Sequence, residues 1–284
     1  AADPTDDRQA LIKQFMHDGE KDWWYYEQLA DQEADSTKRE QIYLAAIAKL
    51  ADSHELLGNY ALLLHENIKN YNKAEEYYLK AIKLQPDDAD YLGNYALLLS
   101  ATDNPSKDYK KAAEYYLKTI ELDPDSANTL GNYALFLSQT DNPHKDYNKA
   151  ADYYLKAIKL DPDNTNILGN YANVLHTDIK DYNKAADCYL KAIKLDPDNS
   201  NNLANYAFFL KNILKDYNKA ADYYLKAIEL DPDNANKLNN YAIFLSDIRK
   251  DYDKAEEYSL KAIQLYPDDA IYLGTYAKLL ISQE

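Results

Sequence analysis

The chain has 284 residues, 46% of them hydrophobic, and its 32 basic residues against 48 acidic ones give a net charge of -16. No apolar run approaches the roughly 20 residues that a membrane span requires, so we expect a soluble protein with no membrane partner. The negative charge would repel a polyphosphate, which disfavours nucleic acid as a partner. The single cysteine, Cys188, excludes an internal disulfide framework and suits a cytoplasmic location.

The N-terminal part of the chain departs from the pattern of the rest. Residues 1–19 are predicted to form a leader and one extra helix, over the stretch DDRQALIKQFMHDG. Residues 20–53 read as one degenerate repeat, because QIYLAAIAKL fits the second helix of the units that follow. Six clearer units then occupy residues 54–268.

A recurring proline marks the end of each clear unit. It stands at Pro86, Pro124, Pro162, Pro197, Pro232 and Pro267, with successive spacings of 38, 38, 35, 35 and 35 residues. We therefore divide this part of the chain into units 54–88, 89–126, 127–164, 165–199, 200–234 and 235–268. The two longer units have extra residues beside an Asn-Pro turn, which predicts loop insertions that leave the helices unchanged.

Each unit carries two helical patterns, and each pattern begins after a residue that caps helix N-termini. The first helices, such as NNLANYAFFLKN, follow Asp88, Ser126, Asn164, Asn199, Asn234 and Asp269. The second helices, such as YNKAADYYLKAIKL, follow Asn70, Asp108, Asp146, Asp181, Asp216 and Asp251. Residues 269–284 are a first helix without its partner, which is either a capping helix or the edge of a longer protein.

The small and large residues of these helices resemble the tetratricopeptide repeat family from about residue 36 onward. The family's small residue on first helices matches Ala61, Ala96, Ala134, Ala172, Ala207 and Ala242. On second helices its small residues match Ala74, Ala112, Ala150, Ala185, Ala220 and Ala255, then Ala81, Ala157, Ala192, Ala227 and Ala262, with Thr119 as the exception. Its large residue matches Tyr78, Tyr116, Tyr154, Tyr189 and Tyr224, with Ser259 as the exception.

This resemblance implies an all-α fold, a right-handed superhelical solenoid of antiparallel helix pairs. The family's usual period is 34 residues, so the 35-residue units carry one extra residue, which we place in the turn between the paired helices. The family's turn glycine is replaced there by Lys69, Lys107, Lys145, Lys180, Lys215 and Lys250.

Little in the sequence points to catalysis. The five histidines are scattered without metal-ligand spacing, so we expect neither a metal nor a cofactor. Cys188 lies in a column otherwise filled by tyrosine, which indicates a packing role and not a nucleophile. The tyrosines themselves are predicted to pack within and between repeats, with their hydroxyls reaching solvent or a backbone carbonyl. The chain is therefore not expected to be an enzyme.

A second stripe on the first helices lies opposite their apolar stripe and is rich in amides. Its central column is Asn59, Asn94, Asn132, Asn170, Asn205 and Asn240. One turn earlier stand Asn128, Asn166, Asn201 and Asn236. One turn later stand Leu62, Leu97, Leu135, Asn173, Phe208 and Ile243.

In the tetratricopeptide family the first helices line a concave groove, so the resemblance implies that this amide stripe faces the groove. A carboxamide offers a donor and an acceptor that complement a peptide bond, so a row of them suits an extended backbone. The row resembles the asparagine ladders of O-GlcNAc transferase and importin-alpha. Alternatively, the asparagines bridge adjacent repeats. Gly58, Gly93, Gly131 and Gly169, beside the row, either let a ligand backbone approach or admit a neighbouring helix.

The hypothesis from the sequence is a scaffold that binds an extended peptide segment of another protein in this groove. We expect no clamp for the carboxylate tail of chaperones, because the groove cations are few: Lys211 and Lys278 beyond His65 and His176. One alternative is a regulatory arm that docks a catalytic domain of a larger protein. Another is an RNA-binding repeat, because pentatricopeptide repeats share the 35-residue period, but the charge opposes it. The partner and the oligomeric state are left open.

Overall fold

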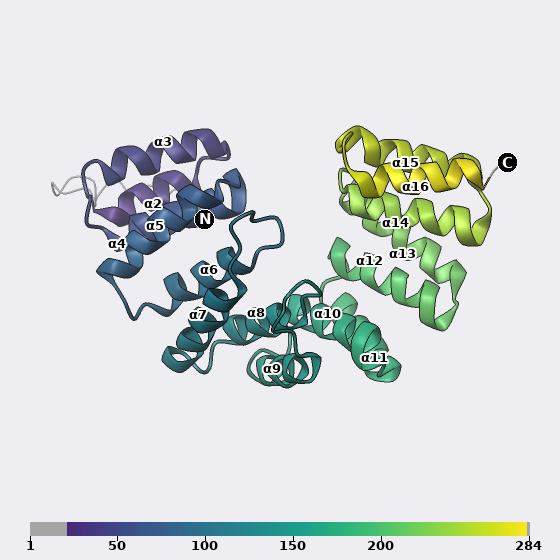
Figure 1. Cartoon of the computed structure of the whole chain (residues 1–284), viewed down its shortest axis with the longest axis horizontal. Coiled ribbons are helices and arrows are strands. Elements are labelled where there is room, and N and C mark those ends of the chain that lie inside the picture. Colours follow the sequence, from purple (N-terminus) through teal and green to yellow (C-terminus); the bar gives the residue numbers. More distant parts are fainter. Residues whose placement is uncertain (1–21, 283–284) are drawn as a thin grey trace, which may run out of the picture. The chain divides into compact units, whose positions relative to one another are not determined.

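The helices follow one another in antiparallel pairs (Figure 1). The computed structural model describes residues 22–282, so the extra helix expected within residues 1–19 lies outside the described part. The first helices of the pairs are α2 (Trp23–Asp31), α4 (His54–Leu63), α6 (Ala89–Ser100), α8 (Ala127–Ser138), α10 (Thr165–Val174), α12 (Ser200–Phe209), α14 (Ala235–Phe244) and α16 (Ala270–Ile281). The second helices are α3 (Ser36–Ile47), α5 (Tyr71–Leu84), α7 (Tyr109–Leu122), α9 (Tyr147–Leu160), α11 (Tyr182–Leu195), α13 (Tyr217–Leu230) and α15 (Tyr252–Leu265). The all-α class predicted from the sequence is confirmed.

The contacts divide the chain into two units, which are described separately below. Unit 1 holds described residues 22–133 with 141–144, and unit 2 holds described residues 134–140 with 145–282. Helix α8 contributes residues to both units. None of the helices in the described part is both long and apolar enough to cross a lipid bilayer.

The helix starts predicted from the sequence are confirmed at every cap. Asn164 Oδ1 accepts the N–H of Ile167 at 3.2 Å at the start of α10, and Asp108 Oδ1 accepts the N–H of Lys111 at 3.0 Å at the start of α7. Such a bond satisfies one of the backbone donors that the first helical turn leaves free. At the other end, the second helices of the six clear units stop two residues before the recurring proline, as α5 does at Leu84.

Alanines and tyrosines form the core between the paired helices. The alanines predicted at the helix crossings are fully buried, as Ala61, Ala74 and Ala81 show. Each large tyrosine of a second helix packs against a tyrosine of the next first helix, as Tyr78 does against Tyr95 with ring centroids 6.2 Å apart. The sequence pattern therefore predicts the core of the repeat correctly.

The expectation for the tyrosine hydroxyls is wrong at several positions. Tyr95 and Tyr60 donate to the carboxylates of Glu75 and Glu40, at 2.6 and 2.8 Å, and not to water or a backbone carbonyl. The hydroxyls of Tyr78 and Tyr224 are buried without a partner among the described residues. Burial of a tyrosine ring stabilises by several kcal/mol at about 25 cal/mol per Å², which outweighs the roughly 1 to 3 kcal/mol cost of one unpaired hydroxyl.

The extra residue of the 35-residue units is accommodated by π-helical turns at the ends of first helices. These turns are η1 (Leu64–Ile68), η2 (Leu175–Ile179), η3 (Leu210–Leu214) and η4 (Leu245–Arg249). Each one ends at a lysine in the left-handed conformation: Lys69, Lys180, Lys215 and Lys250, with φ between 57° and 67°. A left-handed residue is what the family's turn glycine would supply, so lysine adopts a conformation that glycine would accept more readily.

The two longer units close the same turn without a π-helix. In a short unit the N–H of Asn70 donates to the carbonyl of Leu64 at 2.9 Å. In a long unit the N–H of Asp108 donates to the equivalent carbonyl of Leu99, also at 2.9 Å. The buried Asn104 fastens the longer loop by donating to the carbonyl of Leu98 at 2.8 Å. The insertion therefore lies between these two closing groups and leaves the second helix unchanged, whereas the first helix loses its π-helical end.

Candidate functional site

The first helices of the six clear units, α4 to α14, expose one narrow stripe and bury most of the rest of their surface. In α14 all residues are buried except Asn236, Asn240 and Ile243, which are spaced four and three residues apart. In α4 the residues left accessible are His54, Glu55, Asn59 and Leu62, which include the same spacing. This spacing places the three columns predicted from the sequence on one face of each helix. We call this stripe, within each unit, the asparagine face.

The central asparagines of the asparagine face are accessible and unpaired. Five of the six are half-buried and Asn240 is exposed. Within residues 22–282 none of their carboxamides forms a hydrogen bond. Unit 1 carries Asn59, Asn94 and Asn132, and unit 2 carries Asn170, Asn205 and Asn240. The donors and acceptors of these side chains are therefore available to solvent, and within the described residues they form no hydrogen bond that stabilises the fold.

The asparagines one turn earlier are engaged by the next repeat. Asn166 Oδ1 accepts the Nδ2–H of Asn199 at 3.3 Å, and Asn236 Oδ1 accepts the hydroxyl of Tyr272 at 3.1 Å. Asn201 Oδ1 accepts from Lys237 Nζ at 2.8 Å. Asn128 also has an interaction partner. This column thus takes part in the stacking of repeats, which was the alternative role considered for the asparagines.

The residues one turn later provide apolar contact on the same face. Leu62, Leu135 and Phe208 are 36%, 37% and 40% exposed, and Leu97 and Ile243 are partly buried. Asn173, the polar member of the column, is also exposed. Amides and apolar side chains therefore alternate along the exposed stripe. This combination suits a peptide ligand whose backbone meets the amides and whose apolar side chains meet the apolar residues.

Two glycines beside the asparagine row, Gly58 and Gly169, make room for the next repeat, whereas a Cβ on Gly93 would make only an ordinary contact, 3.4 Å from Cγ2 of Thr119 in the same repeat. A Cβ on Gly58 would lie 2.7 Å from Cδ1 of Tyr91, which belongs to the next first helix. A Cβ on Gly169 would lie 2.9 Å from Cγ of Asn202, again on the next first helix. The space that these glycines leave is filled by protein, so they admit the neighbouring helix. Gly274 differs, because a Cβ there would meet nothing within 4 Å.

A buried lysine in unit 2 is a site residue that the sequence did not single out. Lys237 is 4% exposed, and its Nζ lies 2.6 Å from Asp231 Oδ2 as well as 2.8 Å from Asn201 Oδ1. The hydrogen bond from Lys237 lowers the pKa of Asp231. Lys237 stands where Tyr91 and Asn202 stand in other first helices, and that column mixes residue types, so it gave no periodic signal.

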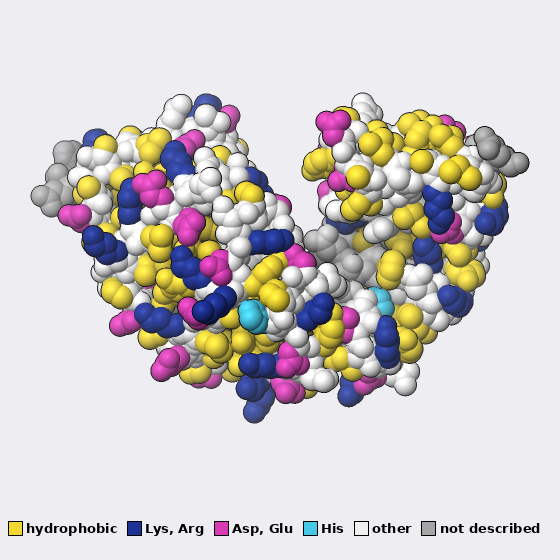
Figure 2. Space-filling view, viewed as in Figure 1, with side chains coloured by type: hydrophobic (Ala, Val, Ile, Leu, Met, Phe, Trp, Pro, Cys, Tyr) yellow, Lys and Arg dark blue, Asp and Glu magenta, His cyan; other side chains and the backbone are white. Residues whose placement is uncertain are grey.

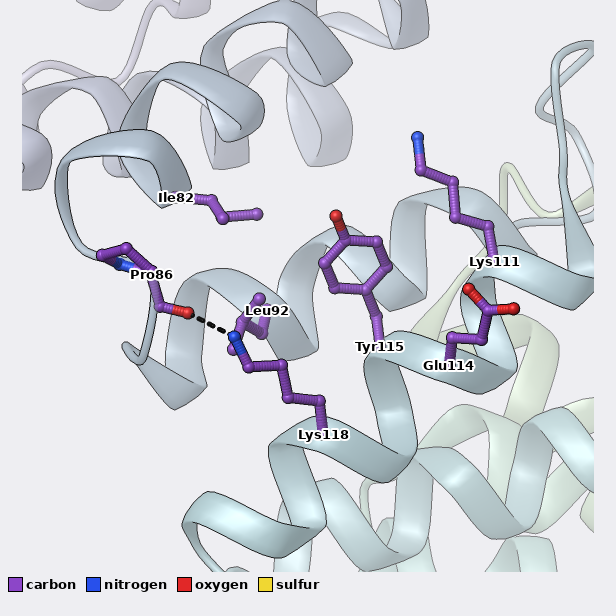
Figure 3. Close-up of a pocket in the computed structure, with 7 residues that line it drawn as sticks. All are labelled: Ile82, Pro86, Leu92, Lys111, Glu114, Tyr115 and Lys118. Carbon is purple, nitrogen blue, oxygen red and sulfur yellow. Dashed lines mark hydrogen bonds between the residues drawn. The ribbon is translucent and has the colours of Figure 1, made fainter.

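A pocket of about 360 Å³ lies in unit 1 where α5, α6 and α7 meet (Figure 3). Ile82, Leu92 and Tyr115 supply its apolar lining. Its lysines are held by neighbouring groups: Lys118 donates to the carbonyl of Pro86 at 2.8 Å, and Lys111 donates to the hydroxyl of Tyr95. Around it, basic and acidic side chains are mixed over the visible face of α5 and α7 (Figure 2). The pocket is thus part of the joint between two repeats.

Side chains that can bind a metal ion are not clustered within residues 22–282. In the part of the chain that the structure describes, no three His, Cys, Asp or Glu side chains are grouped so as to hold a metal ion. Burial raises the pKa of the Cys188 thiol, which keeps it protonated and a poor nucleophile at neutral pH.

Antiparallel helix pairs stacked through buried alanines and tyrosines define a helical repeat protein. The chain belongs to the tetratricopeptide repeat family, whose models match residues 54–88, 89–126, 129–164, 153–186, 188–221, 223–257 and 247–269. A Sel1 repeat model also matches residues 178–197. No catalytic family matches, and members of this family are generally scaffolds for protein–protein interaction. A comparison with curated protein sequences gives no match.

Three solved structures show the same fold at low sequence identity. The pilF protein of Pseudomonas aeruginosa aligns with a TM-score of 0.60 and 23% identity, over 80% of this chain and 98% of that one. A chain of the APC/C hetero-tetramer Cut9–Hcn1 aligns with a TM-score of 0.72 and 15% identity, over 90% of this chain. Yeast Tom70 aligns with a TM-score of 0.61 and 21% identity, over 87% of this chain. This chain spans 48% of the second structure and 52% of the third.

Proposed function

We propose that the chain is a scaffold whose asparagine faces bind an extended peptide segment of another protein. The observation that carries the proposal is that each unit has three accessible carboxamides without hydrogen-bond partners in the described residues. A side chain needed only for stacking would be paired, as the neighbouring column is. The Cut9–Hcn1 hetero-tetramer, in which a chain of this fold is assembled with a different protein, supports an interaction role.

The chemistry of the face favours the backbone of the ligand. Each carboxamide offers one acceptor and one NH₂ donor, which matches the N–H and C=O of a peptide bond. Each hydrogen bond made in water contributes about 0.5 to 1.5 kcal/mol net, so three asparagines in one unit give moderate affinity. The apolar column beside them, with Leu62 and Phe208, adds contact area and selects apolar ligand side chains.

The test uses 12-residue peptides selected from a random display library against the wild-type chain. Two variants remove a pair of carboxamides, Asn59→Ala with Asn94→Ala in unit 1, and Asn170→Ala with Asn205→Ala in unit 2. We expect the pair in the unit that binds a given peptide to weaken its Kd by about tenfold to a hundredfold. The thermal unfolding midpoint should change little, because these side chains have no partners to lose.

The matched control is Asn148→Ala with Asn183→Ala, which removes two exposed carboxamides from second helices. It should leave the Kd within twofold of wild type. A library that yields no binder, or binders that both asparagine-face pairs leave unaffected, would refute the proposal.

A further inference from the structure

The first helices of unit 1 carry only acidic charge on their exposed stripe. The segments His54–Ile68 and Ala89–Ser100 and residues 127–133 of α8 contain Glu55, Glu66 and Asp90 but no lysine or arginine. In unit 2 the equivalent segments contain Lys211, Arg249 and Lys278, besides the buried Lys237, with only two acids, Asp178 and Asp247. Because the chain as a whole is acidic, its net charge does not distinguish one unit from the other. A difference in charge between equivalent residues of the two units is more informative about ligand preference.

The acids of unit 1 lie on the same stripe as the asparagines. Glu55, Asn59 and Leu62 are spaced four and three residues apart on α4, and Asp90, Asn94 and Leu97 repeat that spacing on α6. The residues equivalent to Glu55 and Asp90 are asparagines in the later repeats, Asn128 in unit 1 and Asn166, Asn201 and Asn236 in unit 2, and the last first helix has Ile271 there. The carboxylates are thus one helical turn from the carboxamides, at a distance that a ligand side chain spans.

These carboxylates are accessible to a ligand. Asp90 is exposed, and the side chain of Glu66 is 46% exposed beside His65, whose Nδ1 lies 3.5 Å away. The side chain of Glu55 is 26% exposed and has two neighbours: Ser53 Oγ donates to it at 2.8 Å, and His54 Nε2 lies 3.5 Å away. Burial lowers the pKa of His65, so this neighbour leaves the charge of Glu66 uncompensated at neutral pH.

The spacing of the first helices sets the register of an extended ligand. Tyr91 of α6 fills the space beside Gly58 of α4, so the two first helices are in direct contact. Helices in contact lie about 8 to 10 Å apart. Three residues of an extended or polyproline backbone cover about 9 to 10 Å. One helix of the asparagine face therefore corresponds to about three ligand residues.

We propose that the asparagine face of unit 1 selects a basic extended segment with an apolar side chain at about every third residue. The apolar side chains would contact Leu62 and Leu97, and the basic side chains would contact Glu55, Asp90 and Glu66. This inference rests on the proposed function and adds the chemical class of the ligand to it.

Three synthetic 10-residue peptides test the inference by calorimetric titration. The first has leucine at every third position, lysine after each leucine and serine elsewhere. The second replaces each lysine by glutamate, and the third keeps the composition of the first with its leucines adjacent. We expect the first peptide to bind at least tenfold tighter than the other two, and 0.5 M NaCl to reduce its advantage over the glutamate peptide.

The variant Glu55→Gln with Asp90→Asn should reduce the preference for lysine over glutamate at least fivefold. The control Glu76→Gln with Glu121→Gln makes the same change of charge on second helices and should leave the preference intact. Equal affinity for the lysine and glutamate peptides, or binding of neither, would overturn the inference. If the peptides bind without charge preference but Asn59→Ala with Asn94→Ala weakens them, the inference fails and the proposed function stands. If the asparagine pair has no effect either, both fail.

Discussion

Histidine and serine occupy equivalent positions at the ends of two first helices, and each contacts the buried hydroxyl of a tyrosine on the following second helix. His176 is 3% exposed, and its Nδ1 lies 3.0 Å from the hydroxyl of Tyr189. Ser100 stands at the equivalent place, with its Oγ 3.3 Å from the hydroxyl of Tyr116. Both give a buried tyrosine hydroxyl a partner. Only the histidine makes that contact depend on pH.

His176 should make unit 2 lose stability in mild acid. Burial, with Lys180 adding to it and Asp178 opposing it, lowers the pKa of His176 to about 4. Histidine in an unfolded chain titrates near 6.5, so between these values the unfolded state binds more protons than the folded state. The free energy of unfolding should therefore fall as the pH drops from about 6.5 to about 4, by about 3 kcal/mol from this residue.

The measurement is urea denaturation at pH 7.5 and pH 5 for the wild type and for His176→Ser. The serine variant keeps a partner for Tyr189, as Ser100 does for Tyr116, and has no proton to gain. It should lose less stability between the two pH values than the wild type does. An equal loss in both proteins would show that His176 does not carry the effect, since all other titrating groups are shared.

At the scale of the helix, the pairing of glycine and asparagine in LGNYA has two separate causes. The glycine is placed by contact, because Tyr91 or Asn202 of the next first helix fills the space that a Cβ would need. The asparagine next to it faces solvent and has no partner among the described residues. Both residues are poor helix formers, so each must be retained for a reason other than the helix itself.

Two glycines of this column make a matched pair for a stability test. Gly58→Ala should destabilise the protein by about 1 to 3 kcal/mol, because the new Cβ would displace the ring of Tyr91, whose hydroxyl is held 3.0 Å from His54 Nδ1. Gly274→Ala should stabilise it by about 0.5 to 1 kcal/mol, because nothing lies within 4 Å and alanine favours the helix. Thermal unfolding of both variants checks the pair. Two changes of the same sign would contradict this explanation of the glycine column.

Structural features that recur in each repeat could be predicted from the sequence, whereas features without a periodic pattern were missed. The caps, the helix ends before proline and the buried alanines recur in nearly every unit, so each was visible as a column. The π-helical turns were missed, because one extra residue in a turn has no signature that distinguishes a longer loop from a wider helical turn. Lys237 and its contact with Asn201 were missed because this contact is made with a residue of the preceding repeat and is not visible in the local pattern.

The candidate site was predicted in part for the same reason. The alternation of four and three residues identified the exposed stripe, because it follows from helix geometry alone. Contacts between repeats decide which asparagines of that stripe have no hydrogen-bond partner. The spacing of residues within one helix does not reveal these contacts. Asn201 and Asn236 are engaged by Lys237 and Tyr272, whereas Asn205 and Asn240 are not engaged by the described residues.

At the scale of the whole molecule, the chain is a set of near-identical repeats on which a few columns vary. The core columns hardly change from repeat to repeat, whereas the charged column of the stripe has carboxylates at Glu55 and Asp90, carboxamides at the next four positions and Ile271 in the last helix. Stability in such a protein comes mostly from each repeat and its neighbour, so exposed columns are free to diverge. We infer that the core columns maintain the solenoid and the exposed columns set ligand preference in each unit.

The central claim is that the carboxamides recognise the backbone of the ligand, and an amide-to-ester scan of a bound 12-residue peptide tests it most directly. Each ester removes one backbone N–H and keeps every side chain. The claim predicts a Kd weakened about two- to tenfold at positions that recur about every third residue. It also predicts that this weakening disappears in the variant that lacks the asparagine pair of the binding unit. Esters that leave the Kd unchanged at every position, in a peptide whose side-chain replacements abolish binding, would contradict the claim.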